Sequence, residues 1–265
     1  MIKIEKSRWR RPALCCALLL MAIVIAMIVT PYDPYHVDVS NKLQKPSSLH
    51  WFGTDHLGRD VLTRLVYGAP FTLLFPFLVL VISAIIGSLF GLVSSYVGGK
   101  VDSAMTAVMD AFSSIPNLLL AIAITGLLGP GLLNTLLAIS ISWWVQYARI
   151  VRSVGITIRR EPYMLAAQLS GSFGGKLIYR HLLPNTKPLV RELFFLDMGA
   201  VILLMSSLSF LGLGAQPPLA EWGSMMFDGK SYLQIAPWIT LIPAAAITVF
   251  VMLFYLIGRG LQSRE

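Results

Sequence analysis

Charged side chains are scarce in this sequence. They make up 13% of its 265 residues, whereas hydrophobic residues make up 56%. Soluble globular domains typically carry about 25% charged residues. So few charges cannot cover a water-soluble globule of this length, and the composition therefore predicts one integral membrane domain surrounded largely by lipid.

Cysteine and catalytic motifs are also scarce. The two cysteines, Cys15 and Cys16, are adjacent inside an apolar run, which excludes a disulfide framework. The Gly-Lys pairs at 99–100 and 175–176 lack the following Ser or Thr and the upstream glycine of a phosphate-binding loop. No H-E-x-x-H motif or nucleophile–base pair stands out. We therefore expect no catalytic residue, no cofactor and no resident metal on this chain.

Long apolar runs are what the sequence has in abundance. A bilayer core of about 30 Å is crossed by about 20 apolar residues in a helix. The third run has Asp102 and Asp110 near its start, so an interfacial helix leading into a shorter buried helix is an alternative there. The runs predict an all-α membrane protein with six transmembrane helices, at residues 12–30, 72–97, 103–128, 131–150, 190–214 and 236–258.

Two runs carry further signals. Residues 12–30 follow a basic segment, as in a signal peptide, but exceed the usual apolar region of about 7–15 residues and end without a clean cleavage motif. We therefore predict an uncleaved first helix. In the second run, Gly87 and Gly91 form a Gly-x-x-x-Gly pair that would allow close approach of another helix.

The basic residues predict an orientation. All but five of the 21 Lys and Arg residues fall in cytosolic segments when both termini are placed in the cytosol. They lie beside apolar runs rather than in a patch with aromatics, so we expect no nucleic acid among the partners. The predicted layout is a cytosolic N-terminus at 1–11, the first helix at 12–30, an external segment at 31–70, a transmembrane core at 71–258 and a cytosolic tail at 259–265.

The polar stretch at 161–185 interrupts the apolar core and is predicted to be cytosolic. Pro162 suits the first turn of a helix, and Gly171 is suited to end that helix in a left-handed conformation. Ser172 is a candidate N-cap for a second short helix, and Pro184 a candidate stop. The residues alone leave two interpretations open: a docking surface for a soluble partner, or an ordinary basic loop kept inside by its charge.

This stretch resembles the loop of ABC-importer permeases that docks on the ATPase. The shared pattern is A-A-x-x-x-G followed by H-x-L-P-N, and Leu165 replaces the acidic residue that usually precedes the alanine pair. The E-x-Y-x-x-A-A form seen here is similar to the peptide and nickel branch of the family. The resemblance implies coupling helices with nine contact candidates: Glu161, Tyr163, Ala166, Ala167, Gly171, His181, Leu183, Pro184 and Asn185.

Further motifs extend the resemblance over roughly residues 8–258. The segments at 50–69, 97–102, 127–134, 147–152 and 209–218 resemble those of dipeptide, oligopeptide and nickel permeases in order along the chain. Arg259 and the short tail depart from the acidic continuation that is common in the family.

The resemblance implies a type I importer fold and an ATP-driven permease subunit of a bacterial cytoplasmic (inner) membrane, moving peptides or nickel, as ion or chelate. The implied partners are the lipid bilayer, a homologous second permease, two ABC ATPases that hold ATP and Mg, and an extracytoplasmic solute-binding protein. An ion-coupled secondary transporter is the alternative. It predicts inverted repeats and charges near the bilayer midplane, and the sequence has no convincing repeat.

Five residues are further site candidates. Asp110 and Asp197 are ionisable groups in or near predicted spans, and such groups often mark transport pathways. The alternative for these two acids is interfacial ion pairing. Met205 is a third pathway candidate. His50 and His56 are candidate metal ligands in the external segment. The alternative for the histidines is ordinary loop chemistry, beside a turn at 53–60 held by hydrogen bonds of its Asp and Arg residues.

Overall fold

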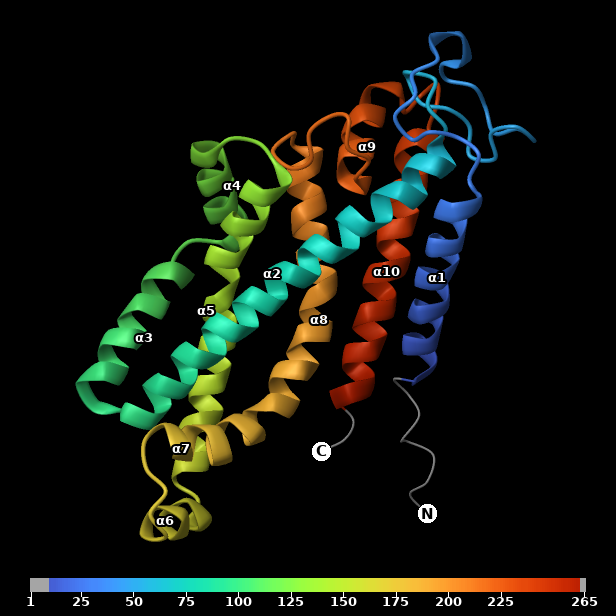
Figure 1. The fold of residues 1–265 in the computed structure, drawn as a ribbon. Coiled ribbons are helices and arrows are strands. Elements are labelled where there is room, and N and C mark those ends of the chain that lie inside the picture. The colour runs from blue at the N-terminus through green and yellow to red at the C-terminus, as the bar shows by residue number, and fades with distance from the viewer. Residues whose placement is uncertain (1–9, 263–265) are drawn as a thin grey trace.

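The computed structural model describes residues 10–262 and is built from helices packed side by side (Figure 1). Three short segments accompany the α-helices: the 3₁₀ helices η2 (Val39–Asn41) and η4 (Lys230–Tyr232) and the π-helical turn η3 (Ile178–Leu182). Within residues 10–262 the only β-type pairing is an isolated bridge between Thr54 and Asp60. The α-helices are α1 (Arg10–Val29), α2 (Val61–Val97), α3 (Gly99–Ser113), α4 (Asn117–Leu128), α5 (Leu132–Arg159), α6 (Pro162–Leu169), α7 (Gly175–Leu177), α8 (Leu183–Phe210), α9 (Trp222–Gly229) and α10 (Trp238–Gln262).

Within residues 10–262, four helical segments are long and apolar enough to cross a membrane. They are α1, α2, the continuous stretch Gly175–Phe210 and α10, and the bent pair of α3 and α4 gives a fifth if it counts as one span. The remaining predicted span corresponds to α5, which has 28 residues but carries polar side chains such as Asn134 and Gln146. Packed against α2, α4 and α8, α5 is the central helix of the bundle.

The two ends of the bundle differ. In Figure 1, α2 runs diagonally across α5 and α8, and α6 and α7 hang below the lower end. The start of α1 and the end of α10 also lie toward that end, whereas α4, α9 and the segment before α2 lie at the opposite end. The predicted termini at 1–11 and 259–265 extend into residues 1–9 and 263–265, which are outside the described residues.

The second helix begins earlier than predicted. It starts at Val61 rather than at residue 72, so it takes up the last part of the predicted external segment. The Asp60 side chain accepts a hydrogen bond from the Thr63 N–H at 2.7 Å and caps the helix. Arg64 is buried but donates to the Pro34 carbonyl at 3.0 Å. A basic residue can therefore lie in the first turn because tertiary contacts satisfy it.

The predicted span at 103–128 is not one continuous helix. The chain breaks between α3 and α4, and the two helices meet at 81°. Pro116 precedes α4 in an extended conformation, and a proline disfavours helical geometry at the residue before it and removes a backbone donor. The alternative of two shorter helices describes this region. The later spans shift less: α8 begins at Leu183 rather than at residue 190, and α10 continues to Gln262.

Candidate functional site: the loop between α5 and α8

The loop begins with the predicted short helix. Pro162 occupies the first turn of α6, and Gly171 follows the helix with φ of +82°. The Gly171 N–H donates to the Gln168 carbonyl at 2.9 Å, and the Ser172 N–H donates to the Ala167 carbonyl at 3.0 Å. This pair of bonds is the Schellman arrangement, which favours glycine at the left-handed position. The prediction that Gly171 ends the helix is confirmed.

Two details of the second half were predicted wrongly. Ser172 is buried and is not the N-cap of α7; that position is Gly174, with φ of +59°. Pro184 does not stop the helix, because the chain runs on from the π-helical turn η3 into α8. The Leu183 N–H donates to the Ile178 carbonyl, five residues back. Pro184 therefore occupies the first turn of α8, directly after the π-helical turn.

An apolar cluster fixes the inner face of the loop. Met164, Leu177 and Leu182 are fully buried and pack with Leu92 of α2 and Val151 of α5. These residues belong to three separate parts of the chain, so the cluster joins the loop to both long helices. Close packing of this kind leaves little freedom for the loop to move independently of the bundle.

A second contact fixes the bend of the loop. The Gly174 N–H donates to the Tyr96 hydroxyl oxygen at 2.6 Å. Tyr96 belongs to α2, far away in the sequence, and no local pattern signals this partnership. The bend is therefore held both by its own glycines and by α2.

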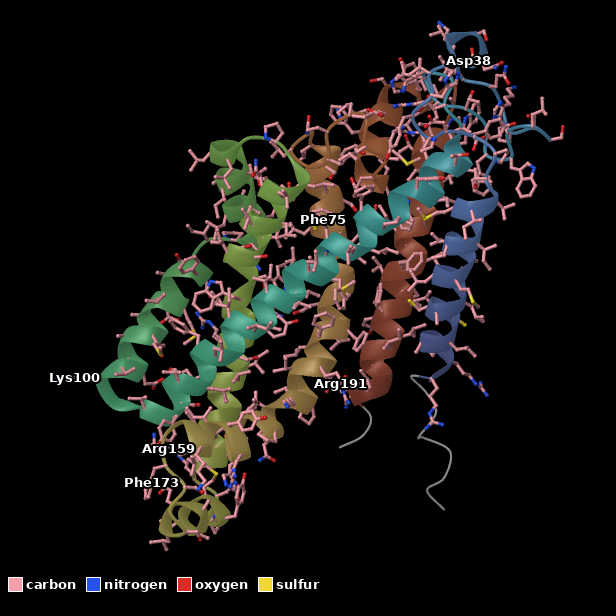
Figure 2. All side chains as sticks on the ribbon, in the orientation of Figure 1. Asp38, Phe75, Lys100, Arg159, Phe173 and Arg191 are labelled. Carbon is pink, nitrogen blue, oxygen red and sulfur yellow. The ribbon has the colours of Figure 1, made fainter. Side chains whose placement is uncertain are left out.

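The outer face of the loop is apolar and uncovered in the isolated chain. Leu169 is 82% exposed, and Leu165, Phe173 and Tyr179 are also exposed. Figure 2 shows Phe173 at the end of the bundle that carries α6. Exposed apolar patches of this kind mark surfaces that contact another protein or a membrane. We call these four residues the outer face.

Three of the predicted contact residues gather at the junction with α8. The Asn185 side-chain amide donates to the Tyr163 hydroxyl at 3.3 Å and to the His181 carbonyl at 2.6 Å. The Tyr163 and His181 rings lie 6.5 Å apart between centroids. Partial burial, and then the charge of Glu161, raises the pKa of the Tyr163 hydroxyl.

The other predicted contact residues are spread over the loop surface. Glu161, Ala166 and Pro184 are exposed, while Ala167 and Leu183 are half-buried. Sequence reasoning missed the anchor Met164 and the exposed residues Leu169 and Phe173. The alternation of a buried Met164 with an exposed Leu165 follows helical spacing, but a short helix gives too few turns to reveal it.

The pathway candidates separate into a core pair and a surface residue. Asp197 on α8 is buried, accepting hydrogen bonds from Trp143 Nε1 at 3.1 Å and Gln146 Nε2 at 3.3 Å. Met205 lies farther along α8 and is also buried. Asp110 instead pairs with Arg149 at 2.7 Å, and both side chains are exposed. The ion pairing considered as the alternative for Asp110 is present.

The two external histidines have different surroundings. His50 Nδ1 lies 2.9 Å from an Asp60 carboxylate oxygen, and the His56 ring stacks on Tyr232 with centroids 5.6 Å apart. Across residues 10–262 the structure has no group of three or more His, Cys, Asp or Glu side chains placed to hold a metal ion.

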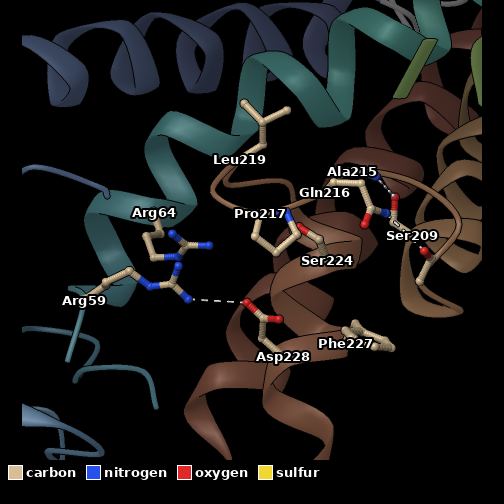
Figure 3. A pocket seen from close by; sticks show the side chains of 11 residues that line it. Arg59, Arg64, Ser209, Ala215, Gln216, Pro217, Leu219, Ser224, Phe227 and Asp228 are labelled. Atoms are coloured by element: carbon tan, nitrogen blue, oxygen red, sulfur yellow. Dashed lines mark hydrogen bonds and ion pairs between the residues drawn. The ribbon is translucent and has the colours of Figure 1, made fainter. Parts of the chain in front are cut away.

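A buried charge cluster lies at the end of the bundle that carries α9, opposite the loop (Figure 3). Arg59 Nε donates to an Asp55 carboxylate oxygen at 2.6 Å, and Arg59 Nη2 lies 3.4 Å from Asp228 of α9. Arg64 approaches Asp55 at 3.6 Å. Arg59, Arg64 and Asp228 border a cavity of about 120 Å³. Asp55 also accepts the N–H groups of Leu57 and Arg59, as the predicted Asp-Arg turn requires.

Comparison with known proteins gives one consistent group of relatives. Residues 83–264 match the family model described as binding-protein-dependent transport system inner membrane component. The dipeptide transport system permease protein of Alkalihalophilus pseudofirmus is 40% identical over 243 residues, covering 92% of this chain and 80% of that protein. The nickel transport system permease protein of Escherichia coli K12 is 36% identical over 258 residues, covering 97% and 93%. The glutathione transport system permease protein of Pectobacterium atrosepticum is 35% identical over 247 residues, covering 92% and 82%.

Proposed function

The chain belongs to the family of binding-protein-dependent transport system inner membrane components, and we propose that its loop at 161–185 docks on a partner ATPase. It is a multi-pass membrane protein and a permease subunit of an ABC importer. Family membership favours the importer over the ion-coupled secondary transporter.

The two-faced construction of the loop is the observation that carries the proposal. Its inner residues are buried against α2 and α5, whereas its outer face exposes Leu165, Leu169, Phe173 and Tyr179. A short helix presenting apolar side chains suits a groove on a partner, as in other helix-in-groove contacts. Among the nine contact candidates, Tyr163, His181 and Asn185 brace the junction of the loop with α8.

The assembly that fits this role contains other subunits. ATPase and binding-protein partners follow from the family, and we propose a homologous second permease and two ATPases, which hold ATP and Mg. This chain itself supplies no catalytic group in that arrangement. ATP-driven closure of the ATPases would push the loop, and the movement would pass to α8 through η3.

We propose a peptide or nickel, as ion or chelate, as the cargo. The support is that relatives of similar identity are named for dipeptide, nickel and glutathione transport. Asp197 and Met205 remain pathway candidates on α8, whereas the exposure of Asp110 favours a role at the interface.

We propose a bacterial inner membrane as the location, with both termini in the cytosol. The support is the excess of Lys and Arg at the end of the bundle that carries α6, together with the position of the start of α1 and the end of α10 toward the same end. The N-terminal residues before Arg10 are basic as well.

Charge on the outer face tests the docking proposal. We expect the double variant Leu169→Asp/Phe173→Asp to lose co-purification of the ATPase and ATP-dependent uptake in reconstituted vesicles, because a carboxylate would be buried against an apolar groove. Membrane insertion should be unchanged, since both side chains already face solvent. The matched control is Leu49→Asp, a 73% exposed leucine at the other end of the molecule. Full ATPase binding by the double variant would disprove docking through this face.

A further inference from the structure

Two basic side chains lie in a groove between α2 and α8. The groove has a volume of about 520 Å³ and is bordered by Ser88 of α2 and by residues within 183–194. Lys187 and Arg191 line it and are both exposed. Neither makes an ion pair or a hydrogen bond with any residue in the described part of the chain, and no acidic residue lines the groove.

The two basic residues share one face of α8. A separation of four residues brings side chains of a helix together, so the ammonium and guanidinium groups can reach the same ligand. Ser88 adds a hydroxyl from the opposite wall. Arginine and lysine are the side chains that most often bind phosphate, the first through its paired N–H groups and the second as a compact charge.

The groove crosses the boundary between polar and apolar parts of α8. Arg191 lies toward the bundle end that carries α6 (Figure 2), and the apolar stretch of the helix begins at Leu193. Val190 and Phe194 line the same groove and are half-buried. Phe194 lies about one turn beyond Arg191, so the groove leads from the level of the two charges to an aromatic wall, in the order in which a phospholipid places its head group and its acyl chains.

We propose that this groove binds an anionic phospholipid. Lys187, Arg191 and Ser88 hold the phosphate, and an acyl chain lies against Val190 and Phe194. Basic pockets between transmembrane helices are known to suit anionic head groups. The apolar wall favours a lipid over a free phosphate ion, which would leave that wall unused. The site lies next to η3, so a bound lipid would brace the base of α8 where the loop joins it.

Lipid retention by the intact importer tests the site. The complex is placed in nanodiscs that contain phosphatidylglycerol and phosphatidylcholine, and bound phosphatidylglycerol is measured by native mass spectrometry. We expect Lys187→Gln/Arg191→Gln to weaken its retention about 30-fold, because each basic residue near an anionic head group contributes roughly one kcal/mol. The exchange Lys187→Arg/Arg191→Lys should keep retention near that of the unaltered protein.

The control removes the same charge elsewhere. Lys42→Gln/Lys45→Gln alters two exposed lysines of the external segment and should leave retention unchanged. Equal retention by the Lys187/Arg191 glutamine variant would overturn the proposal, as would equal binding of phosphatidylcholine. Displacement of the lipid by an equal concentration of inorganic phosphate would show a free-anion site instead. A cross-link from Lys187 to the second permease that persists in excess phosphatidylglycerol would show that protein fills the groove.

Discussion

The close contact between α2 and α5 depends on two glycines of α2, Gly87 and Gly91, which leave no room for a larger side chain. A Cβ atom at Gly87 would lie 2.4 Å from the Trp144 carbonyl oxygen, 2.6 Å from Tyr147 Cβ and 2.9 Å from the Ala148 nitrogen. At Gly91 it would lie 2.5 Å from the Ala148 carbonyl oxygen. Most of these neighbours are backbone atoms, so relief requires α5 itself to retreat by about 1 Å to reach ordinary contact distances.

The expected loss of stability follows from two opposing effects. Overpacking a core typically costs about 1–3 kcal/mol per site, and a clash with backbone places the cost near the upper end. Replacing a helical glycine by alanine recovers about 1 kcal/mol through backbone entropy. The net loss is about 2 kcal/mol for Gly87→Ala. The double variant with Gly91→Ala should lose about 2–4 kcal/mol, because one retreat of α5 relieves both clashes in part.

The assay is unfolding in mixed micelles with increasing sodium dodecyl sulfate, followed by tryptophan fluorescence. Trp143 and Trp144 are buried on α5 and report on the helix that must move. The matched control is Gly126→Ala on α4, where an added Cβ meets no atom within 4 Å; it should be neutral or gain up to about 1 kcal/mol. If Gly87→Ala proves as stable as Gly126→Ala, the packing argument is refuted.

Two further substitutions test the loop and the opposite end of the bundle, which carries α9. Met164→Ala should remove about 2–5 kcal/mol of packing beneath α6, which would be measured as faster amide hydrogen exchange in that helix. Leu165→Ala, at the exposed neighbouring position, should change the exchange little. Equal exchange in both variants would contradict the anchoring role of Met164. Burial raises the pKa of Glu221, which caps α9, so its contribution to stability is full below the ordinary value of 4.5 and is lost as the pH rises through the folded-state pKa. As the pH rises above 4.5, the thermal midpoint of the Glu221→Gln variant should therefore fall less than that of the unaltered protein. Parallel plots of thermal midpoint against pH for the two proteins would rule this out.

The sequence predicts the helical class well because apolar run length is a strong and local signal. It misses features that depend on distant partners. The N-terminal start of α2 is hidden by Arg64, a basic residue that becomes acceptable only when the Pro34 carbonyl accepts its hydrogen bond. The bend between α3 and α4 has a local cause in Pro116, but a proline also occurs inside membrane helices, as Pro76 does in α2. The local pattern alone cannot separate these outcomes.

In the candidate site too, locally determined residues are predictable and residues fixed by tertiary contacts are not. Gly171 is predictable because a left-handed position after a helix favours glycine, and the Schellman bonds follow from it. Pro184 misleads because the π-helical turn before it moves the proline into the first turn of α8. The anchors Met164 and Tyr96 come from tertiary packing, for which one sequence carries no signal.

These departures from the prediction bear directly on transmission of movement. A helix that stopped at Pro184 would leave a flexible joint between the loop and the transmembrane bundle. The structure instead has a continuous helical path from Gly175 to Phe210, which includes both Asp197 and Met205. The loop is also fixed to α2 and α5 through its buried face. A force applied to the outer face therefore acts on three long helices at once, and α8 receives it without an intervening hinge.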